Sequence, residues 1–433
     1  NFLSFSQSPM NLRRRSKNDW GRLGMTSEWR TIRAADFIDF NPRLSLKKGD
    51  IATKVAMDKL KPFTKKIPET EKAEFNGGAK FCNGDTVMAR ITPCLENGKT
   101  AYVDMLDDGE IGFGSTEFIV MRAKTEISDP QFVYYTAINP VFRNVAIKSM
   151  VGSSGRQRVQ QSVLEELELS VPDLDEQRRI GDFLARIDEK IALNDRINDN
   201  LQQQAQALFK KWFIDNPDAI SWKEGTFSNL IEKTISGDWG KDSPSGNNTE
   251  MVYCIRGADI PEVRAGNKGK MPTRYILPKN YAAKQLVDGD IVVEISGGSP
   301  TQSTGRAAAV SDALLARYDK GMVCTNFCKA LKPRAGYSMY VYYYWQYLYD
   351  RDIFFSYENG TTGIKNLDIN GFIETEPIVI APESLAEKFD AVCQTNFSKI
   401  YANGMENEHL ALVRDTLLPK LMSGEIDVSA VQL

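Results

Sequence analysis

The chain has 433 residues, of which 42% are hydrophobic and 26% are charged, and its formal net charge is −3. This is the composition of a folded protein of roughly two to four domains. The one histidine, His409, excludes metal sites built on two or three histidines, including the HExxH helix. A catalytic triad would have to use His409, which lies in a helical, Asn-rich stretch. The slight acidity gives no overall basic character of the kind that favours nucleic acids.

The cysteines and the hydropathy indicate a reducing compartment and no membrane span. The six cysteines are scattered and form no CxxC pair, which is typical of buried thiols. No apolar run approaches the roughly 18 residues that cross a bilayer. Residues 1–24 contain several cations, Arg13, Arg14, Arg15 and Lys17, but no hydrophobic region. We expect a disordered leader, or an upstream extension before a natural start near Met25; a basic arm on DNA is the alternative.

The chain repeats itself with an offset of about 208 residues. A Gly-Asp turn that leads into an apolar strand occurs at residues 81–88 and again at 286–293. The later matches, in chain order, are 98–103 with 305–310, 115–118 with 324–327, 132–135 with 340–343, and 153–155 with 361–363. A unit of about 200 residues is too long for a solenoid repeat. The sequence therefore predicts a duplicated domain.

Each copy ends in a long stretch with apolar residues at the 3-4 spacing of a coiled-coil seam. Two asparagines interrupt each seam: Asn194 and Asn198 in the first, Asn403 and Asn407 in the second. A buried Asn costs stability but fixes the register of two helices, because only one alignment pairs the amides. We expect these helices to pair antiparallel, with the globular units at opposite ends about a pseudo-two-fold axis. Two unrelated amphipathic helices, each on its own unit, are the alternative.

The globular units are predicted to be mixed α/β, so the fold class is α/β (α+β). Expected strands include 86–91, 112–121, 291–295 and 378–380, separated by loops rich in Gly and Pro. Helices are expected at 130–147 and 339–349. The aromatic residues of the second helix can stack bases, but their spacing repeats at 132–135 and favours a core helix packed on the sheet.

Polar loops that combine glycine with a cation occur twice in each copy. Residues 92–99 and 296–306 follow the Gly-Asp strands, and both reach Gly plus a cation; residues 151–161 and 359–367 form the second pair. Such loops can contact phosphates through amides and cations, and base edges through Asn or Gln. Plain hairpin connections are the alternative. The candidate DNA-binding residues are Asn97, Lys99, Ser153, Ser154, Arg156, Gln157, Arg158, Ser296, Ser299, Thr301, Gln302, Arg306, Thr361, Thr362, Lys365 and Asn366, with Lys54, Lys59 and Lys61 from a basic run that is otherwise a solvated face.

One segment identifies a family. Residues 171–191 read VPDLDEQRRIGDFLARIDEKI and closely resemble the start of the conserved helix in specificity (S) subunits of type I restriction-modification systems, where a strand ends in Pro and Glu-Gln opens a long helix. The duplicated layout from about residue 29 to 428 is similar to that family too, although the second copy lacks the Glu-Gln pair. The resemblance implies target recognition domains at 25–173 and 217–382, spacer helices at 174–216 and 383–423, and a tail at 424–433.

The resemblance also implies what the chain does. Each domain would read one half of a split, asymmetric site on double-stranded DNA, and the helices would set the gap and dock two methyltransferase (M) subunits. Restriction (R) subunits complete such a complex, and S-adenosylmethionine, Mg and ATP are expected only on these partners. The chain itself is expected to be non-catalytic, without cofactor or metal, in the cytoplasm of a bacterium or archaeon. The alternatives are a DNA-reading subunit of a related defence methyltransferase without a restriction partner, and a coiled-coil scaffold whose heads bind protein.

Overall fold

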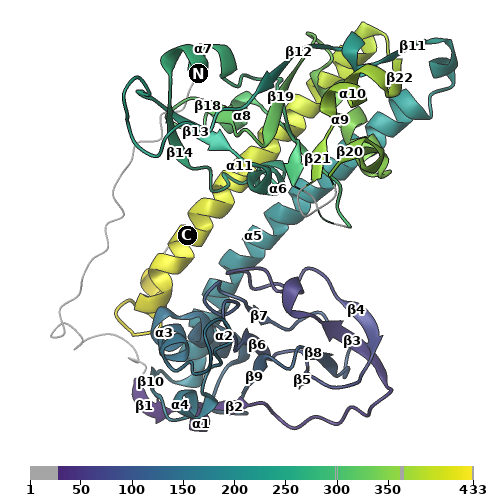
Figure 1. The fold of residues 1–433 in the computed structure, drawn as a ribbon. Coiled ribbons are helices and arrows are strands. Elements are labelled where there is room, and N and C mark those ends of the chain that lie inside the picture. Colours follow the sequence, from purple (N-terminus) through teal and green to yellow (C-terminus); the bar gives the residue numbers. More distant parts are fainter. Residues whose placement is uncertain (1–27, 298, 300, 361–364, 432–433) are drawn as a thin grey trace. The chain divides into compact units, whose positions relative to one another are not determined.

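The computed structural model describes residues 28–297, 299, 301–360 and 365–431 (Figure 1). The chain forms two compact units. Unit 1 is Asn1–Asp188 with Arg414–Leu433, and unit 2 is Glu189–Val413. The predicted leader at 1–24 lies outside the described residues, as do the candidates Thr361 and Thr362.

Unit 1 contains two four-stranded sheets, with strand orders β2-β9-β6-β7 and β4-β3-β8-β5, and a separate β1–β10 pair. Its strands are β1 (Arg30–Arg33), β2 (Ile38–Phe40), β3 (Ile51–Val55), β4 (Glu71–Glu74), β5 (Ala79–Phe81), β6 (Thr86–Ala89), β7 (Thr100–Tyr102), β8 (Gly112–Gly114), β9 (Phe118–Ala123) and β10 (Glu168–Val171). Its short helices are α1 (Ala34–Phe37), α2 (Pro130–Ile138), α3 (Pro140–Lys148) and α4 (Gln161–Glu165).

Unit 2 contains the sheets β12-β19-β15-β17, β14-β13-β18 and β16-β21-β20, and a β11–β22 pair. Its strands are β11 (Lys223–Thr226), β12 (Ile231–Ser236), β13 (Glu250–Ile255), β14 (Thr273–Ile276), β15 (Ile291–Glu294), β16 (Ser296–Gly297), β17 (Ala307–Ala309), β18 (Met322–Cys324), β19 (Cys328–Pro333), β20 (Glu358–Asn359), β21 (Lys365–Leu367) and β22 (Pro377–Ile380). Its helices are α6 (Ile260–Arg264), α7 (Pro278–Lys284), α8 (Asp312–Leu315), α9 (Ser338–Tyr349) and α10 (Ile369–Thr375). The aromatic helix α9 is buried in the core, as its spacing predicted.

The two units share the topology of their two main sheets, which confirms the duplication, although, among the described residues, β5 and the sheet β16-β21-β20 each occur in one unit only. The sheet β2-β9-β6-β7 matches β12-β19-β15-β17, and β4-β3-β8 matches β14-β13-β18. In both units the second of these sheets contains a parallel pair, β3 with β8 and β13 with β18, while its other pairings are antiparallel. The mixed α/β class is likewise confirmed.

The repeated Gly-Asp turns fix the start of the central strands β6 and β15. The carboxylate of Asp85 accepts a hydrogen bond from the backbone N–H of Cys82, three residues earlier, at 2.8 Å. The same carboxylate forms an ion pair with Arg122 at 2.7 Å. Asp290 repeats this arrangement, with the N–H of Val287 at 2.9 Å and Lys332 at 2.8 Å. In each unit the Asp carboxylate thus closes the turn through a backbone N–H and also binds a cation on the neighbouring strand.

Two predicted elements are each divided in the structure. The strand expected at 112–121 is two strands, β8 and β9, which lie in different sheets. The helix expected at 130–147 breaks between α2 and α3, because Asn139 accepts the N–H of Val141 at 3.1 Å and caps a new helix that begins with Pro140.

The long helices are α5 (Leu174–Phe209), with 36 residues, and α11 (Glu383–Leu421), with 39 residues (Figure 1). At about 1.5 Å per residue, α5 is about 54 Å long. Within unit 2, Asn194 bonds to Asn407 and Asn198 to Asn403, so residue numbers rise along one helix as they fall along the other. The antiparallel pairing of the helices is therefore confirmed.

Candidate nucleic-acid interface

The two predicted loops of unit 1 are joined by backbone hydrogen bonds. Ile91 and Arg158 form an antiparallel bridge, although they are far apart in sequence. Next to it the N–H of Thr92 donates to the carbonyl of Gln157 at 3.1 Å, and the N–H of Gln157 donates to the Thr92 hydroxyl at 3.0 Å. The second loop closes on itself through a further bridge, between Val151 and Arg158. Residues 91–99 and 151–158 therefore form one surface.

The two loops of unit 2 are joined in the same way. Ser296 in β16 pairs with Asn366 in β21, and Asn366 pairs in turn with Asn359 in β20. Gly297 lies opposite Lys365. The middle strand of this small sheet thus corresponds to the segment around Arg158 in unit 1.

Matching hydrogen bonds anchor both joined surfaces to the central sheets. The N–H of Val159 donates to the carbonyl of Arg90 at 2.8 Å, and the N–H of Leu367 donates to the carbonyl of Ile295 at 2.9 Å. The joined surfaces of the two units, which resemble each other only weakly in sequence, are thus attached at equivalent positions of the central sheets. We call each joined surface a loop pair: residues 91–99 with 151–158 in unit 1, and residues 296, 297, 299 and 301–306 with 358–360 and 365–367 in unit 2.

The structure corrects one step of the predicted repeat. The sequence match pairs Phe118 with Phe327, but Phe118 opens β9 and is 2% exposed, whereas Phe327 precedes β19 and is 62% exposed. Equivalent hydrogen bonds settle the register: Arg90 donates to the carbonyl of Glu117 as Ile295 donates to that of Phe327. Glu117 is therefore the counterpart of Phe327, and the sequence match was one residue out of register in this turn.

Most candidate cations at the loop pairs bind carboxylates of the chain itself. Arg158 donates three hydrogen bonds of 2.6–3.0 Å to Glu117, and these hydrogen bonds lower the pKa of Glu117. Arg306 pairs with Glu294 through bonds of 2.7 and 2.8 Å, and the hydrogen bond to Glu294 raises the pKa of Arg306.

Lys365 of unit 2 pairs with Glu358 at 2.7 Å, and the other oxygen of Glu358 accepts the N–H and the hydroxyl of Thr304. Carboxylates such as Glu117, Glu294 and Glu358 were not predicted from the sequence. No local spacing marks these partners, since Glu117 and Arg158 meet only after folding.

The basic run of unit 1 is also largely paired. Lys54 lies on β3 and contacts Glu71 of β4 at 2.8 Å, and Lys59 pairs with Glu69. Lys99 donates to the carbonyl of Met57 at 2.8 Å, which ties the cation of the first loop to the basic run. These cations hold the fold together as well as carrying charge.

The remaining candidates are distributed between exposed and half-buried positions. In the described part of the chain, Lys61 and Arg156 are the exposed candidate cations without an ion pair. The other exposed candidates are Asn97, Ser153, Ser154, Thr301, Gln302 and Asn366. The half-buried ones are Gln157, Ser296 and Ser299.

The asparagines of the helix seam form two adjacent buried layers in unit 2. Asn194 Nδ2 donates to Asn407 Oδ1 at 2.9 Å, and Asn403 Nδ2 donates to Asn198 Oδ1 at 2.8 Å. Asn198 also donates to the carbonyls of Ile400 and Ala265, each at 3.1 Å. All four asparagines are less than 10% exposed.

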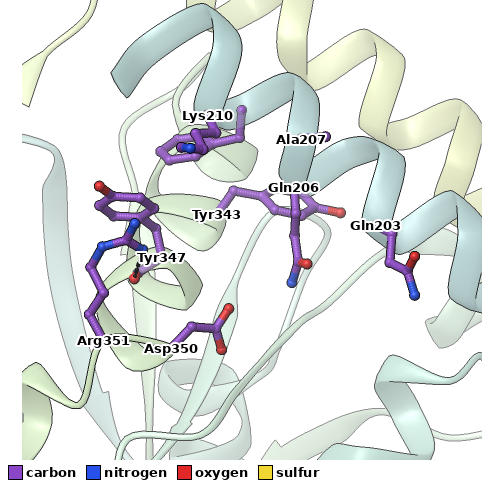
Figure 2. Close-up of a pocket in the computed structure, with 9 residues that line it drawn as sticks. Gln203, Gln206, Ala207, Lys210, Tyr343, Tyr347, Asp350 and Arg351 are labelled. Atoms are coloured by element: carbon purple, nitrogen blue, oxygen red, sulfur yellow. Dashed lines mark hydrogen bonds between the residues drawn. The ribbon is translucent and has the colours of Figure 1, made fainter. Parts of the chain in front are cut away.

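Unit 2 also has two open pockets along α5. The first, of about 290 Å³, lies between α5 and α9, where Gln203, Gln206 and Lys210 face Tyr347 and Arg351 (Figure 2). The Arg351 guanidinium lies 3.5 Å from the Tyr347 ring centroid. The second, of about 330 Å³, is lined by the candidates Gln302 and Arg306 together with residues of α5 and α6.

The described residues offer neither a metal cluster nor a membrane-spanning helix. They contain no group of three or more His, Cys, Asp or Glu placed to hold a metal ion. In the same part of the chain, no helix is both long and apolar enough to cross a membrane.

Comparisons with known proteins find similar specificity subunits. Residues 27–203 match the family model described as the type I restriction modification DNA specificity domain. The MjaIX specificity subunit of Methanocaldococcus jannaschii is 27% identical over an alignment of 302 residues, which covers 65% of this chain and 66% of that subunit, just under two thirds of its length. The HindI specificity subunit of Haemophilus influenzae is 24% identical over 415 residues, with 79% of this chain and 86% of that subunit covered.

A solved structure shares the fold. The S subunit of a type I restriction-modification system from M. genitalium has a TM-score of 0.51 and 17% identity to this chain, covering 92% of this chain and 97% of its own. The match of residues 27–203 to the type I restriction modification DNA specificity domain and the similarity to these subunits confirm the resemblance of the chain to type I specificity subunits.

Proposed function

We propose that this chain is the DNA sequence-recognition subunit of a type I restriction-modification complex, and that each unit reads one half of a split site. The observation that carries the proposal is the duplicated loop pair. Both units present an equivalent hydrogen-bonded platform of amide, hydroxyl and cationic side chains, and the platform of unit 1 lies within the residues that match the DNA specificity domain.

The residues of the two platforms differ at equivalent places. The central bridge is Ile91 with Arg158 in unit 1 and Ser296 with Asn366 in unit 2. Arginine is suited to bidentate contact with guanine, and asparagine with adenine. Since each such contact contributes roughly 1–3 kcal/mol of discrimination, these differences alone predict two unlike half-sites and an asymmetric target.

The charge distribution indicates that the chain does not bind DNA tightly alone. The net charge is −3, and Arg158, Arg306 and Lys365 each bind a carboxylate of the chain. Tight binding depends on phosphate contacts that release counterions. We propose that two methyltransferase subunits supply much of this contact, and that the isolated chain binds its site weakly.

The proposal assigns the chemistry to the partners. The paired helices α5 and α11 set the distance between half-sites and dock the methyltransferase subunits, with restriction subunits completing the complex. S-adenosylmethionine, Mg and ATP are then bound by the partners, and this chain contributes recognition without catalysis. Because the target is chromosomal or invading DNA, we infer the cytoplasm of a bacterium or archaeon as the compartment.

The test is to map adenine methylation across the genome in cells with and without this chain. We expect a split, asymmetric methylated motif to disappear when the chain is deleted and to return on complementation. An unchanged methylation pattern would instead favour a protein-binding scaffold. Co-purification with tagged chain then shows whether a restriction subunit is present, which separates a complete restriction system from a related methyltransferase.

A further inference from the structure

Two exposed phenylalanines lie next to the loop pairs. Among the Phe and Trp side chains that the structure describes, three are exposed: Phe327 at 62%, Phe63 at 58% and Trp239 at 38%. The carbonyl of Phe327 accepts the N–H of Ile295, the residue before the loop pair of unit 2, and the N–H of Phe63 donates to the carbonyl of Gly98 in the loop pair of unit 1. Isolated exposed apolar residues are ordinary on protein surfaces, but the way in which these two are held is not.

Phe327 has a fixed backbone and a free ring. Its N–H donates to the hydroxyl of Thr325 at 3.2 Å, and its carbonyl accepts the N–H of Ile295 at 2.9 Å. Thr325 is itself buried, and Ile295 immediately precedes the candidate Ser296. The ring of Phe327 is therefore exposed to solvent near β16, while its backbone N–H and carbonyl are both fixed by hydrogen bonds.

Phe63 is held against the first loop of unit 1 by different contacts. Its N–H donates to the carbonyl of Gly98 at 2.9 Å, and a Cβ on Gly98 would lie 2.6 Å from the phenyl ring. Arg143 lies over the ring at 5.2 Å and donates to the carbonyl of Glu96 at 2.7 Å. One face of the ring thus contacts the Arg143 guanidinium, which also binds the backbone of the first loop.

The backbone of Phe63 is also strained. Its φ is +55°, a left-handed conformation that bulky residues rarely adopt. Such conformations cost free energy and persist where the surrounding structure imposes them, which is frequent at binding sites. Phe63 thus combines a strained backbone conformation with an exposed apolar ring.

We propose that Phe63 and Phe327 are specificity-determining residues that make apolar contact with base edges in the major groove, each in a different half-site. The inference rests on the proposed function. The thymine 5-methyl group is the apolar feature of that groove, and phenylalanine is one of the side chains that contact it. A rigid aromatic ring also loses little conformational entropy on binding.

The positions of the rings favour DNA over a protein partner. The counterpart of Phe327 in unit 1 is Glu117, whose carboxylate binds Arg158. The glycine equivalent to Gly98 is Gly305, and the ring against it, Phe354, is fully buried. Two copies of one partner protein would meet equivalent surfaces on the two units, whereas two unlike half-sites require unlike readers.

The experiment uses the chain assembled with its methyltransferase subunits. Methylation rates are measured on duplexes that carry the mapped motif, with each thymine of the two half-sites replaced in turn by uracil, which removes only the methyl group. For the wild-type complex we expect at least one such replacement in each half-site to slow methylation about fourfold, the factor for one methyl group removed from an apolar contact.

The variants Phe63→Ala and Phe327→Ala assign the contacts. Phe327→Ala should abolish the uracil effect in one half-site and leave it intact in the other, and Phe63→Ala should do the reverse. Ile220→Ala, at a residue that is 96% exposed, is the matched control and should leave both effects unchanged. A general loss of folding would lower all rates without this half-site selectivity.

Two outcomes are distinguishable failures. Sequence-specific methylation that ignores every thymine methyl group, or variants that keep both uracil effects, would overturn this inference and leave the proposed function standing. Methylation by the wild-type complex without any split motif would overturn the proposed function itself.

Discussion

Arg414 of α11 donates from Nη1 to Oδ1 of Asp188 on α5 at 2.6 Å, and the two side chains are 7% and 5% exposed. The other oxygen of Asp188 accepts the hydroxyl of Tyr135 at 2.6 Å, which ties the helix pair to the core of unit 1. The counterparts of this pair in the second copy are Phe397 and Ala205, both buried and apolar. The Asn layers are alike in both helices, so this ion pair is one feature that distinguishes α5 with α11 from α5 with a second α5, where Asp188 would face Ala205.

Removing one member of this pair should be much worse than removing both. We expect Arg414→Met to lower the free energy of unfolding by about 3–5 kcal/mol, because it leaves a buried carboxylate unpaired, and Asp188→Leu with Arg414→Met to lower it by less. Urea unfolding of the full chain measures both. The double variant should also self-associate more than wild type in sedimentation velocity. Equal destabilisation by the single and double variants would contradict this role of the pair.

Replacing all four seam asparagines by leucine should separate stability from register. We expect Asn194, Asn198, Asn403 and Asn407 changed together to raise the urea midpoint, since apolar residues pack the seam without polar desolvation. The methylated motif should then lose its single gap length, because the helices can slide. A variant with raised stability and one unchanged gap would show that other contacts fix the register.

Lengthening both helices at the unit boundary should lengthen the gap between half-sites. The boundary falls between Asp188 and Glu189 and between Val413 and Arg414, so seven residues inserted at both places keep each unit intact. Two helical turns add about 10.5 Å, roughly three base pairs of DNA. Methylome mapping should show unchanged half-sites with a longer gap. Insertion into α5 alone is the control and should destabilise the chain, because it breaks the register with α11.

Arg156 should contribute phosphate binding without sequence discrimination. It is an exposed cation in the second loop of unit 1 with no ion pair among the described residues. We expect Arg156→Ala to weaken binding by the assembled complex and to reduce the slope of log affinity against log salt by about one. The methylated motif should not change. Lys48→Ala, which removes an exposed lysine outside the loop pairs, should leave the slope unaltered.

Glu110 should make unit 1 sensitive to acid. Burial raises the pKa of Glu110, but hydrogen bonds from Lys72 and from Thr53 outweigh it and lower that pKa from 4.5 to about 2. Because the folded-state pKa is depressed, the carboxylate stabilises the fold fully above about pH 4.5 and loses this contribution as the pH falls towards 2. Glu110→Gln should flatten the decline of unfolding free energy between pH 5 and pH 3. Parallel declines in wild type and variant would refute the assignment.

The features that were predicted from the sequence are those marked by a regular spacing or by the internal repeat. The 3-4 spacing of α5 and α11 marks their seam, and the repeated Gly-Asp turns at Asp85 and Asp290 mark the start of equivalent strands. The spacing of the aromatic residues in α9 also predicted that this helix lies in the core, because the same spacing recurs in α2.

The features that were missed depend on contacts between distant segments. Strands β8 and β18 have three residues each and are buried throughout, so no alternation of polar and apolar residues reveals where they end. The carboxylates that bind Arg158 and Arg306 lie on other strands or turns. Phe327 was matched to Phe118 because aligning the two phenylalanines places these short turns one residue out of register.

The composition of unit 1 has a consequence for synthesis. Unit 2 is one continuous stretch, whereas unit 1 needs Arg414–Leu433, where Arg414 meets Asp188 and Gly424 packs against Trp29. On the ribosome, the half of the protein that emerges first is therefore the half that is completed last. Until the C-terminal turns of α11 have been synthesised and pack on α5, Asp188 lacks the cation that pairs with it in the folded unit.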